Sequence, residues 1–221
     1  MLKPVMLPLM YKDFYLTRKH LLSLTLLGLA VAALLGRTGA GTTVFLAVAW
    51  VALWNFTARV GYVEERNRTY GLLWTLPLPR RVIVRSKFAS VVVVWAGQLC
   101  LYALAAKVYE LVGLTQFDTL PPATAFFGSL PMLVLMGLYL YLILRFDYLR
   151  ATNGLRFVFL LFLVPLAIPA GYLEPAARWL EAAAAHPSAP AAGSALAAAV
   201  YLGFMRVAER SFERKELRDV G

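Results

Sequence analysis

Charged side chains are scarce in this chain of 221 residues, of which only 15% are Asp, Glu, Lys or Arg, whereas 61% are hydrophobic. Soluble domains average about a quarter charged residues. A soluble globule of this size could not cover so much apolar surface without exposing large patches. The composition therefore excludes an ordinary soluble globular protein and favours a membrane protein.

Cysteine and histidine are almost absent. Cys100 is the single cysteine, so an intrachain disulfide is excluded. His20 and His186 are the two histidines, and there is no cluster of His, Cys or carboxylates at the spacing that zinc sites use. We therefore expect no metal and no cofactor in this chain.

The phosphate-binding sequence G-x-x-x-x-G-K-S/T does not occur anywhere in the chain. That loop holds the phosphates of ATP through its backbone N–H groups and its lysine. The chain therefore cannot bind ATP in this manner. If it is a pump, a separate ATPase must bind ATP and Mg and supply the energy.

What the sequence does contain is a series of long apolar runs. A helix needs about 20 mainly apolar residues to cross a bilayer. Six runs reach or approach this length, at 21–35, 43–62, 88–106, 124–144, 157–172 and 192–207. With no break that suggests a second domain, we predict an all-α integral membrane protein with six transmembrane helices in one domain over 1–221.

The Lys and Arg residues lie mostly between alternate runs. Of the 22, all but Arg37, Lys107 and Arg178 lie in the N-terminal segment, the second and fourth connections or the C-terminal segment. Cationic segments are retained on the cytoplasmic side during insertion, which predicts that both termini are cytoplasmic. The net charge of +10 thus follows topology, and we expect no nucleic-acid partner, which would need the cations on one soluble face.

Before the first run, residues 1–19 have an amphipathic pattern. Met6, Leu7, Met10 and Phe14 fall on one side of a helical wheel, and Lys12 lies on the other. This pattern predicts a helix in the cytoplasmic interface with its apolar side toward the acyl chains. The alternative is that the segment is a cytoplasmic extension of the first span.

The longest cytoplasmic connection, residues 64–87, has an apolar and aromatic middle that is unusual for a loop. Thr69 suits the start of a short helix and Pro77 its end. The apolar side chains between them are Tyr70, Leu72, Leu73, Trp74 and Leu76. The residues alone suit two roles equally: an anchor for a groove of another protein, or a helix lying on the membrane.

Several segments of this connection resemble the loop between spans two and three in type-two ABC exporter permeases. They are Glu65-Arg66, Gly71-Leu72-Leu73, Leu76-Pro77, Arg80 and Val84-Arg85-Ser86-Lys87. The start Tyr11-Lys12-Asp13-Phe14, with Arg18-Lys19, is also similar to the compact bacterial branch that includes exporters of peptide toxins and antimicrobial peptides. Pro79 and Trp74 depart from the usual pattern, which has a small polar residue at the first position and often an acidic residue at the second.

The resemblance implies that this loop forms a coupling helix that docks on the ATP-binding subunit. The docking residues would be Glu65, Arg66, Tyr70, Leu72, Leu73, Trp74, Leu76 and Arg80. It also implies two ATPase subunits, a second copy of the permease or a paralogue, an amphipathic peptide or lipid-like cargo, and a place in the bacterial cytoplasmic membrane.

Two other classes of function remain as alternatives. Glu64-Glu65 followed by Arg68 is similar to the paired-glutamate motif of intramembrane prenyl-protein proteases, although that motif has its arginine where Thr69 stands. A passive channel or scaffold is the other class, and the sparse polar lining of the spans argues against a wide hydrated pore.

Polar residues within spans mark a possible translocation path. Asn55 and Arg59 are one helical turn apart in the second run, and Gln98 lies in the third. Strongly polar groups inside a membrane are candidates for function. They also form hydrogen bonds between helices, which is the reading that we favour.

Overall fold

Every element in the described part of the chain is helical. The computed structural model describes residues 3–35, 41–67, 78–111, 122–146, 148–155 and 189–219. The helices are α1 (Lys3–Leu35), α2 (Gly41–Arg66), α4 (Arg80–Leu111), α5 (Pro122–Phe146) and α8 (Ala189–Asp219). Residues 148–155 form a further short helical segment. The predicted all-α class is confirmed for these ranges.

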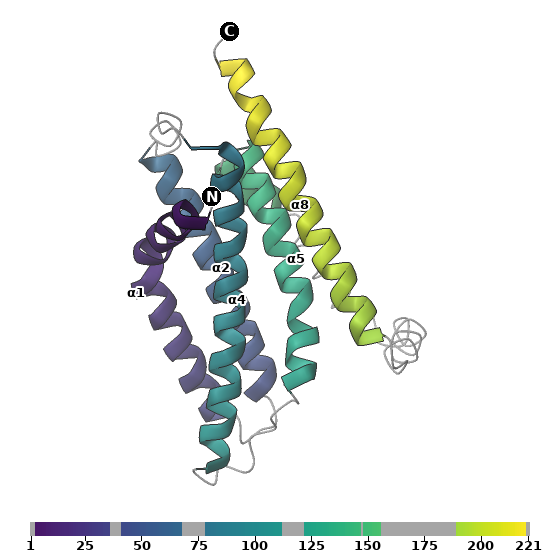
Figure 1. Ribbon diagram of the computed structural model, residues 1–221. Helices are drawn as coiled ribbons and strands as arrows, with labels where there is room; N and C mark the ends of the chain where they lie inside the picture. The colour runs from purple at the N-terminus through teal and green to yellow at the C-terminus, as the bar shows by residue number, and fades with distance from the viewer. Residues whose placement is uncertain are drawn as a thin grey trace.

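The long helices form an elongated bundle. α4 and α5 lie at its centre, with α8 against α5, and α1 packs on α2 and α4 (Figure 1). The C-terminal end of α8 extends beyond the other helices at the end of the bundle where α4 begins. Consequently the end of α2, the start of α4 and the end of α8 all lie at one end of the molecule.

Three helices contain ranges that are long and apolar enough to cross a bilayer by themselves: Arg80–Ala105, Ser129–Phe146 and Ala189–Glu213. Five of the six predicted spans fall within α1, α2, α4, α5 and α8. The fifth, 157–172, lies outside the described residues. Six spans and the position of the termini therefore stay predictions, whereas a multi-pass membrane protein follows from the three apolar helices.

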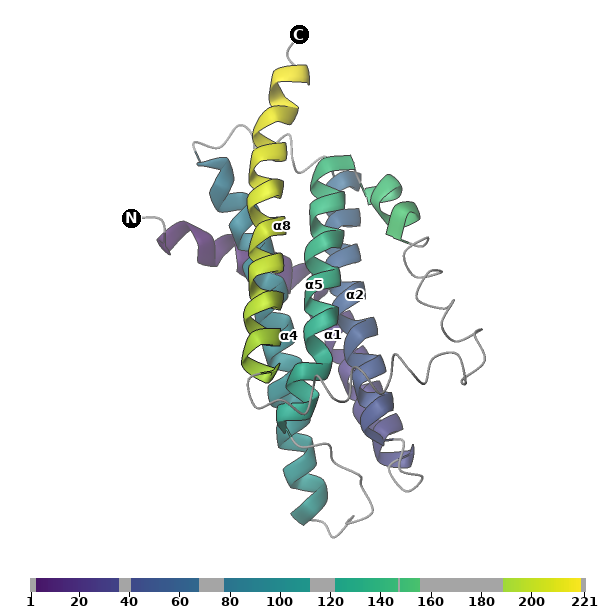
Figure 2. The same cartoon turned by 90° about the vertical axis from the view of Figure 1, so that its right-hand side faces the viewer.

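The N-terminal segment is not a separate helix. α1 is helical without interruption from Lys3 to Leu35, and Figure 2 shows its first part running across the bundle before the rest descends beside α2. Phe14 packs against the ring of Phe56 at 5.6 Å, and Asp13 is buried. The expectation that Phe14 faces the acyl chains is therefore wrong, because its ring fills a space between α1 and α2. Leu7 from the same predicted face is exposed.

Close contacts between helices hold the bundle together. The ring of Tyr201 on α8 lies directly over Gly137 on α5, where an added Cβ would be 2.7 Å from Cδ2 of the tyrosine. The hydroxyl of Tyr201 then donates to the carbonyl oxygen of Phe88 on α4 at 2.8 Å. Small residues at helix crossings and hydrogen bonds between helices are the usual sources of stability where lipid removes the hydrophobic driving force.

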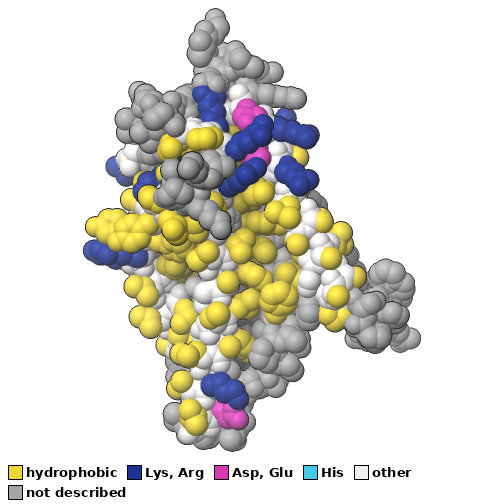
Figure 3. Space-filling model, viewed as in Figure 1, with side chains coloured by type: hydrophobic (Ala, Val, Ile, Leu, Met, Phe, Trp, Pro, Cys, Tyr) yellow, Lys and Arg dark blue, Asp and Glu magenta, His cyan; other side chains and the backbone are white. Residues whose placement is uncertain are grey.

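The outer surface of the bundle is apolar over its middle. Figure 3 shows hydrophobic side chains across the centre of the visible face and Lys and Arg gathered toward its upper end. Exposed large apolar residues occur on all five long helices and include Leu22, Val51, Leu104, Phe146 and Leu196. Such a belt would be unfavourable in water and suits contact with acyl chains.

Candidate functional site at the base of the 64–87 loop

The two ends of the 64–87 connection are fixed by adjoining helices. α2 ends at Arg66, and the N–H of Asn67 still donates to the carbonyl oxygen of Val63 at 3.0 Å. α4 begins at Arg80, directly after Pro79, whose carbonyl oxygen accepts from the N–H of Val82 at 2.8 Å. Proline needs no hydrogen bond for its nitrogen at a helix start, so Pro79 is compatible with its position directly before α4.

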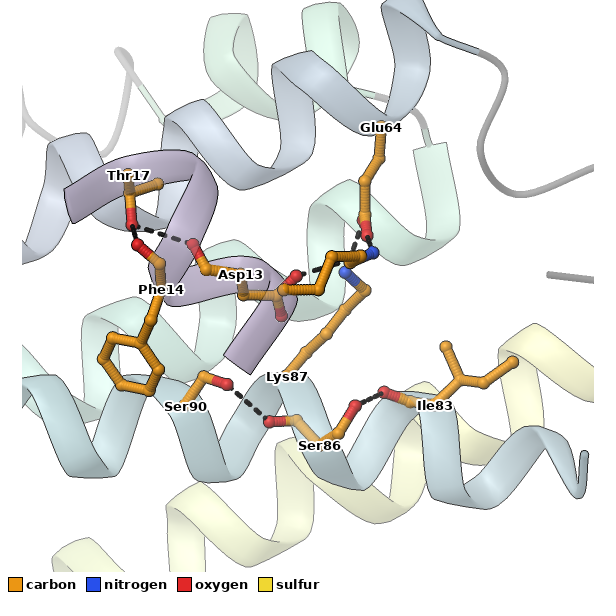
Figure 4. Close-up of polar contacts among 9 residues, drawn as sticks. Asp13, Phe14, Thr17, Glu64, Ile83, Ser86, Lys87 and Ser90 are labelled. Carbon is orange, nitrogen blue, oxygen red and sulfur yellow. Dashed lines mark hydrogen bonds and ion pairs between the residues drawn. The ribbon is translucent and has the colours of Figure 1, made fainter. Parts of the chain in front are cut away.

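A buried cluster of charges joins three helices at the base of this loop. The carboxylate of Glu64 on α2 accepts from Lys87 on α4 through one oxygen and from Lys12 on α1, at 2.7 Å, through the other. The side chains of Glu64 and Lys87 are only 1% and 4% exposed. Figure 4 shows the side chain of Lys87 extending from α4 toward the carboxylate of Glu64, which extends from α2. One carboxylate therefore ties α1, α2 and α4 together.

Asp13 lies beside this cluster, farther from the ammonium group of Lys12 than Glu64 is. Its Oδ1 is 3.6 Å from the ammonium nitrogen of Lys12 and forms no hydrogen bond. Burial in an environment of low dielectric disfavours the charged form of a carboxyl group. Burial raises the pKa of the Asp13 carboxyl above its ordinary value of 3.8, and the nearby lysines offset only part of this effect.

The pKa of Glu64 is shifted in the opposite direction to that of Asp13. Burial alone would raise the pKa of the Glu64 carboxyl, but the two lysine ammonium groups together hold that pKa below its ordinary value of 4.5. Burial likewise opposes the charge on Lys12, yet the facing carboxylates, chiefly that of Glu64, raise the pKa of Lys12 above 10.5. Glu64 and Lys12 are thus charged at neutral pH, and Glu64 has little access to solvent.

Hydroxyl groups on α1 and α4 near the cluster form hydrogen bonds within their own helices. Thr17 donates to the carbonyl oxygen of Asp13 at 2.8 Å, Ser86 to that of Ile83 at 2.8 Å, and Ser90 to that of Ser86 at 2.9 Å (Figure 4). These small side chains satisfy their polar atoms locally, within one turn of the helix. α1 can therefore cross close to α4 without leaving their hydroxyl groups unpaired.

Glu65 connects the loop to a different part of the chain. The backbone N–H of Tyr148, at the start of the 148–155 helical segment, donates to Glu65 Oε2 at 2.5 Å. The rings of Tyr62 and Tyr148 pack edge to face at 5.6 Å. A carboxylate on the first N–H groups of a helix satisfies an unpaired donor and interacts favourably with the helix dipole. Glu65 therefore links the end of α2 to the connection that follows α5.

The start of α4 is joined to α8 by two ion pairs. Arg85 donates to both oxygens of Glu209, at 2.7 and 3.5 Å, and Arg81 donates to Glu213 at 2.8 Å. The second pair is largely exposed and contributes little, as such pairs generally do. The 64–87 connection is thus anchored on α1, α2 and α8 and on the segment after α5.

The predicted docking residues are described only in part. Glu65, Arg66 and Arg80 lie at the two ends of the connection, and Arg66 reaches the hydroxyl of Tyr62 at 3.5 Å. The residues of the predicted coupling helix lie outside the described part of the chain: Tyr70, Leu72, Leu73, Trp74 and Leu76.

Sequence reasoning did not identify the Lys12–Glu64–Lys87 cluster. No pattern in one sequence pairs positions 23 or 52 residues apart. The available signal was the position of opposite charges next to apolar runs, where an unpaired charge would be costly.

The candidate path residues occupy two different environments. Gln98 is buried on α4 and donates to the hydroxyl of Thr25 on α1 at 2.9 Å. Asn55 and Arg59 are exposed on α2, and the amide of Asn55 donates to the carbonyl oxygen of Val51 in its own helix at 2.9 Å. Gln98 therefore forms the interhelical hydrogen bond that we favoured, whereas the bond that Asn55 donates to Val51 stays within α2.

The geometry offers little support for the protease alternative. Glu64 is held between two ammonium groups and Glu65 points to the backbone of Tyr148. The described ranges contain no group of three or more His, Cys, Asp or Glu residues that could hold a metal ion. The two adjacent carboxylates thus serve two separate structural contacts.

Comparison with known proteins identifies the family. No curated protein and no solved structure matches the chain. Residues 8–190, which include the whole 64–87 connection, match the family described as ABC-2 family transporter protein. Members are membrane subunits of transporters that work with an ABC ATPase. The chain belongs to the ABC-2 transporter family, as a multi-pass membrane subunit.

Proposed function

We propose that this chain is the permease subunit of an ATP-driven exporter in the bacterial cytoplasmic membrane, with both termini in the cytoplasm. Two copies, or one copy and a paralogue, enclose the route, and two ATPase subunits bind ATP and Mg beneath them. The family membership supports a transport role. The excess of Lys and Arg at the end of the bundle that carries the 64–87 connection supports the orientation.

The ATPase docks on the apolar helix within the 64–87 connection. Tyr70, Leu73 and Trp74 are the anchors that enter its groove, since large buried aromatic and aliphatic side chains provide most of the binding energy at interfaces. Glu65, Arg66 and Arg80 lie at the base of this helix, with Leu72 and Leu76 on its apolar face.

The observation that carries the proposal is the buried Lys12–Glu64–Lys87 cluster. A force on a loop is passed to the membrane helices only if the loop base is stiff. The cluster joins α1, α2 and α4 at this base, and Glu65 joins the base to Tyr148. A movement of the docked helix therefore moves these elements together.

The cargo is an amphipathic peptide or a lipid-like molecule. The described helices present mostly apolar surface over their middle, with few polar side chains. Such a surface suits a cargo that is itself partly apolar and does not suit a wide hydrated pore.

The test uses the permease purified with its ATPase and placed in lipid nanodiscs. Replacing Leu73 and Trp74 together by Ala is expected to abolish cargo-stimulated ATP hydrolysis and to release the ATPase during purification. Leu111→Ala is the matched control, because Leu111 is 86% exposed at the opposite end of α4. Unchanged stimulation in the double variant would remove these two anchors from the mechanism.

A further inference from the structure

A pocket of about 260 Å³ opens between α1 and α2, and Arg59 on its wall lies in the last two turns of α2, which ends at Arg66. Its lining residues are Tyr15, Leu16, Arg18, Lys19, His20 and Arg59. Pockets for drug-sized ligands start at roughly 300 Å³, so this volume suits a small polar group such as a phosphate with its neighbouring atoms.

The pocket is strongly cationic. Arg18, Lys19 and Arg59 line it, and none of its lining residues in the described part of the chain is a carboxylate. Within the described ranges, none of these three side chains forms an ion pair. This differs from Lys12, which is paired with Glu64 a few residues away on the same helix. Like charges that converge without a counterion repel each other, and an anion in the pocket would relieve this repulsion.

The side chain of Arg18 is held in place by an aromatic ring. Its guanidinium carbon lies 4.4 Å from the ring centroid of Tyr15, which is a favourable cation–π distance. Its planar group can still donate two parallel hydrogen bonds to a phosphate or carboxylate, as arginine commonly does. The pocket is thus partly arranged before any ligand arrives.

Apolar surface continues from the pocket toward the middle of the bundle along α1, and on α2 it resumes at Val51, one turn beyond the exposed amide of Asn55. Leu22 and Leu26 follow Arg18 by four and eight residues, and Val51 precedes Arg59 by eight. Residues at these spacings lie on nearly the same face of a helix, and all three side chains are exposed. A charged pocket at the end of an apolar track matches a headgroup with its acyl chains, whereas a free anion would have no use for the track.

We propose that this pocket binds the phosphate of an anionic lipid, with Arg18, Lys19 and Arg59 around the headgroup and the acyl chains along Leu22, Leu26 and Val51. The pocket lies at the depth of the lipid headgroups, because the predicted first span begins just after His20 and the predicted second span ends at residue 62. The cytoplasmic leaflet is the one that carries anionic lipid. This inference concerns the isolated permease and does not depend on the ATPase or the cargo.

The experiment is a lipid titration of the purified full chain in nonionic detergent, followed by intact-complex mass spectrometry. Phosphatidylglycerol is the anionic probe, and phosphatidylcholine is the zwitterionic probe with the same phosphate. The wild-type chain is expected to prefer phosphatidylglycerol. Its affinity should fall about fivefold in Arg59→Gln and about 25-fold when Arg18→Gln is added, since each cation near a membrane surface contributes about this factor.

Arg210→Gln is the matched control, because Arg210 is exposed on α8 near the same end of the bundle and outside the pocket. It should bind phosphatidylglycerol like the wild type. Arg59→Lys keeps the charge and should retain most of the affinity, and circular dichroism with size-exclusion chromatography verifies the fold of every variant. Lys19→Gln tests whether the third cation of the pocket, which is also exposed, contributes to the affinity for phosphatidylglycerol.

Three results would overturn the proposal. The first is an unchanged affinity in the Arg59 and Arg18 variants. The second is an equal loss in Arg210→Gln, which would indicate a general effect of charge. The third is displacement of the lipid by an equal concentration of inorganic phosphate, because the site would then be one for a free anion.

Discussion

The carboxylate of Glu64 and the ammonium group of Lys87 form an almost fully buried ion pair, although 23 positions separate them in the sequence. Glu64 lies in the last turn of α2, and Lys87 lies near the start of α4. The pair therefore closes the base of the connection that we assign to ATPase docking. Lys12 on α1 contacts the second oxygen of the same carboxylate, so the pair also positions the N-terminal helix.

Removal of one partner should cost much stability. Lys87→Met leaves the Glu64 carboxylate buried with only Lys12 as its counterion, and breaking a buried pair typically costs about 3–5 kcal/mol. We expect a large fall in the free energy of unfolding, measured by denaturant titration in mild detergent. Arg81→Gln is the control, since its pair with Glu213 is largely exposed and contributes little. Equal losses in the two variants would contradict a special role for the buried pair.

Asp13 should make stability depend on pH in a direction opposite to that of Glu64. The pKa of Asp13 is raised in the folded chain, so the folded state holds this proton more tightly than the unfolded state does. Its stabilising contribution is complete below about 3.8 and is lost as the pH rises through the raised pKa. Asp13→Asn should therefore be more stable than the wild type at neutral pH, and this gain should disappear as the pH falls toward 3.8.

Thermal unfolding of the wild-type and Asp13→Asn chains between pH 4 and pH 8 measures this difference in stability. Glu64→Gln provides the comparison, because the pKa of Glu64 is lowered and its contribution is present above 4.5 and is lost at lower pH. An Asp13→Asn chain that is less stable than the wild type at neutral pH would show that the charged carboxylate is needed by the cluster.

Gly137 permits the close contact between α5 and α8. Gly137→Ala places a methyl group 2.7 Å from Cδ2 of Tyr201, and that ring is restrained by the hydrogen bond from its hydroxyl to Phe88. Overpacking of this kind costs about 1–3 kcal/mol. The melting temperature in detergent should fall. Gly203→Ala on α8 is the control, since a Cβ there meets nothing within 4 Å, and the better helix propensity of alanine should leave stability equal or higher.

Glu65 should slow hydrogen exchange at the start of the 148–155 segment. Glu65→Ala removes the acceptor for the N–H of Tyr148, and a hydrogen bond to a charged group contributes about 1.5–3 kcal/mol. Hydrogen exchange at the Tyr148 amide should become at least about tenfold faster, as mass spectrometry of peptides around it would show. Arg66→Gln is the control, because its contact with Tyr62 is exposed. Equal exchange in all three chains would refute the link between the two connections.

Much of the fold was predictable because apolar runs report directly on helices in a membrane protein. Five predicted spans lie within helices, but α4 and α8 are longer than the runs 88–106 and 192–207. Their polar ends stay helical because Arg81, Arg85, Glu209 and Glu213 pair across the two helices. From the sequence, a continuation of the first span into the N-terminal segment was only the alternative to an interfacial helix, because the choice depends on the packing of Phe14 and the burial of Asp13.

The docking role of the candidate site stays a prediction, and the structure describes only its two ends. Glu65 lies at the end of α2 and Arg80 at the start of α4. Glu64 and Lys87 were missed as a pair, because the partner of a buried charge is set by which helices meet in space.

The orientation of the bundle is tested by labelling. Lys107 lies near one end of α4, and Arg210 lies near the opposite end of the bundle (Figure 1). In a Cys100→Ala background, which removes the one native thiol, Lys107→Cys should react with a membrane-impermeant maleimide on intact cells. Arg210→Cys should react only after the membrane is permeabilised, because cationic ends are retained in the cytoplasm. The reverse pattern would place the 64–87 connection outside the cell, beyond the reach of any ATPase, and would eliminate both the docking proposal and the cytoplasmic leaflet as the source of the bound lipid.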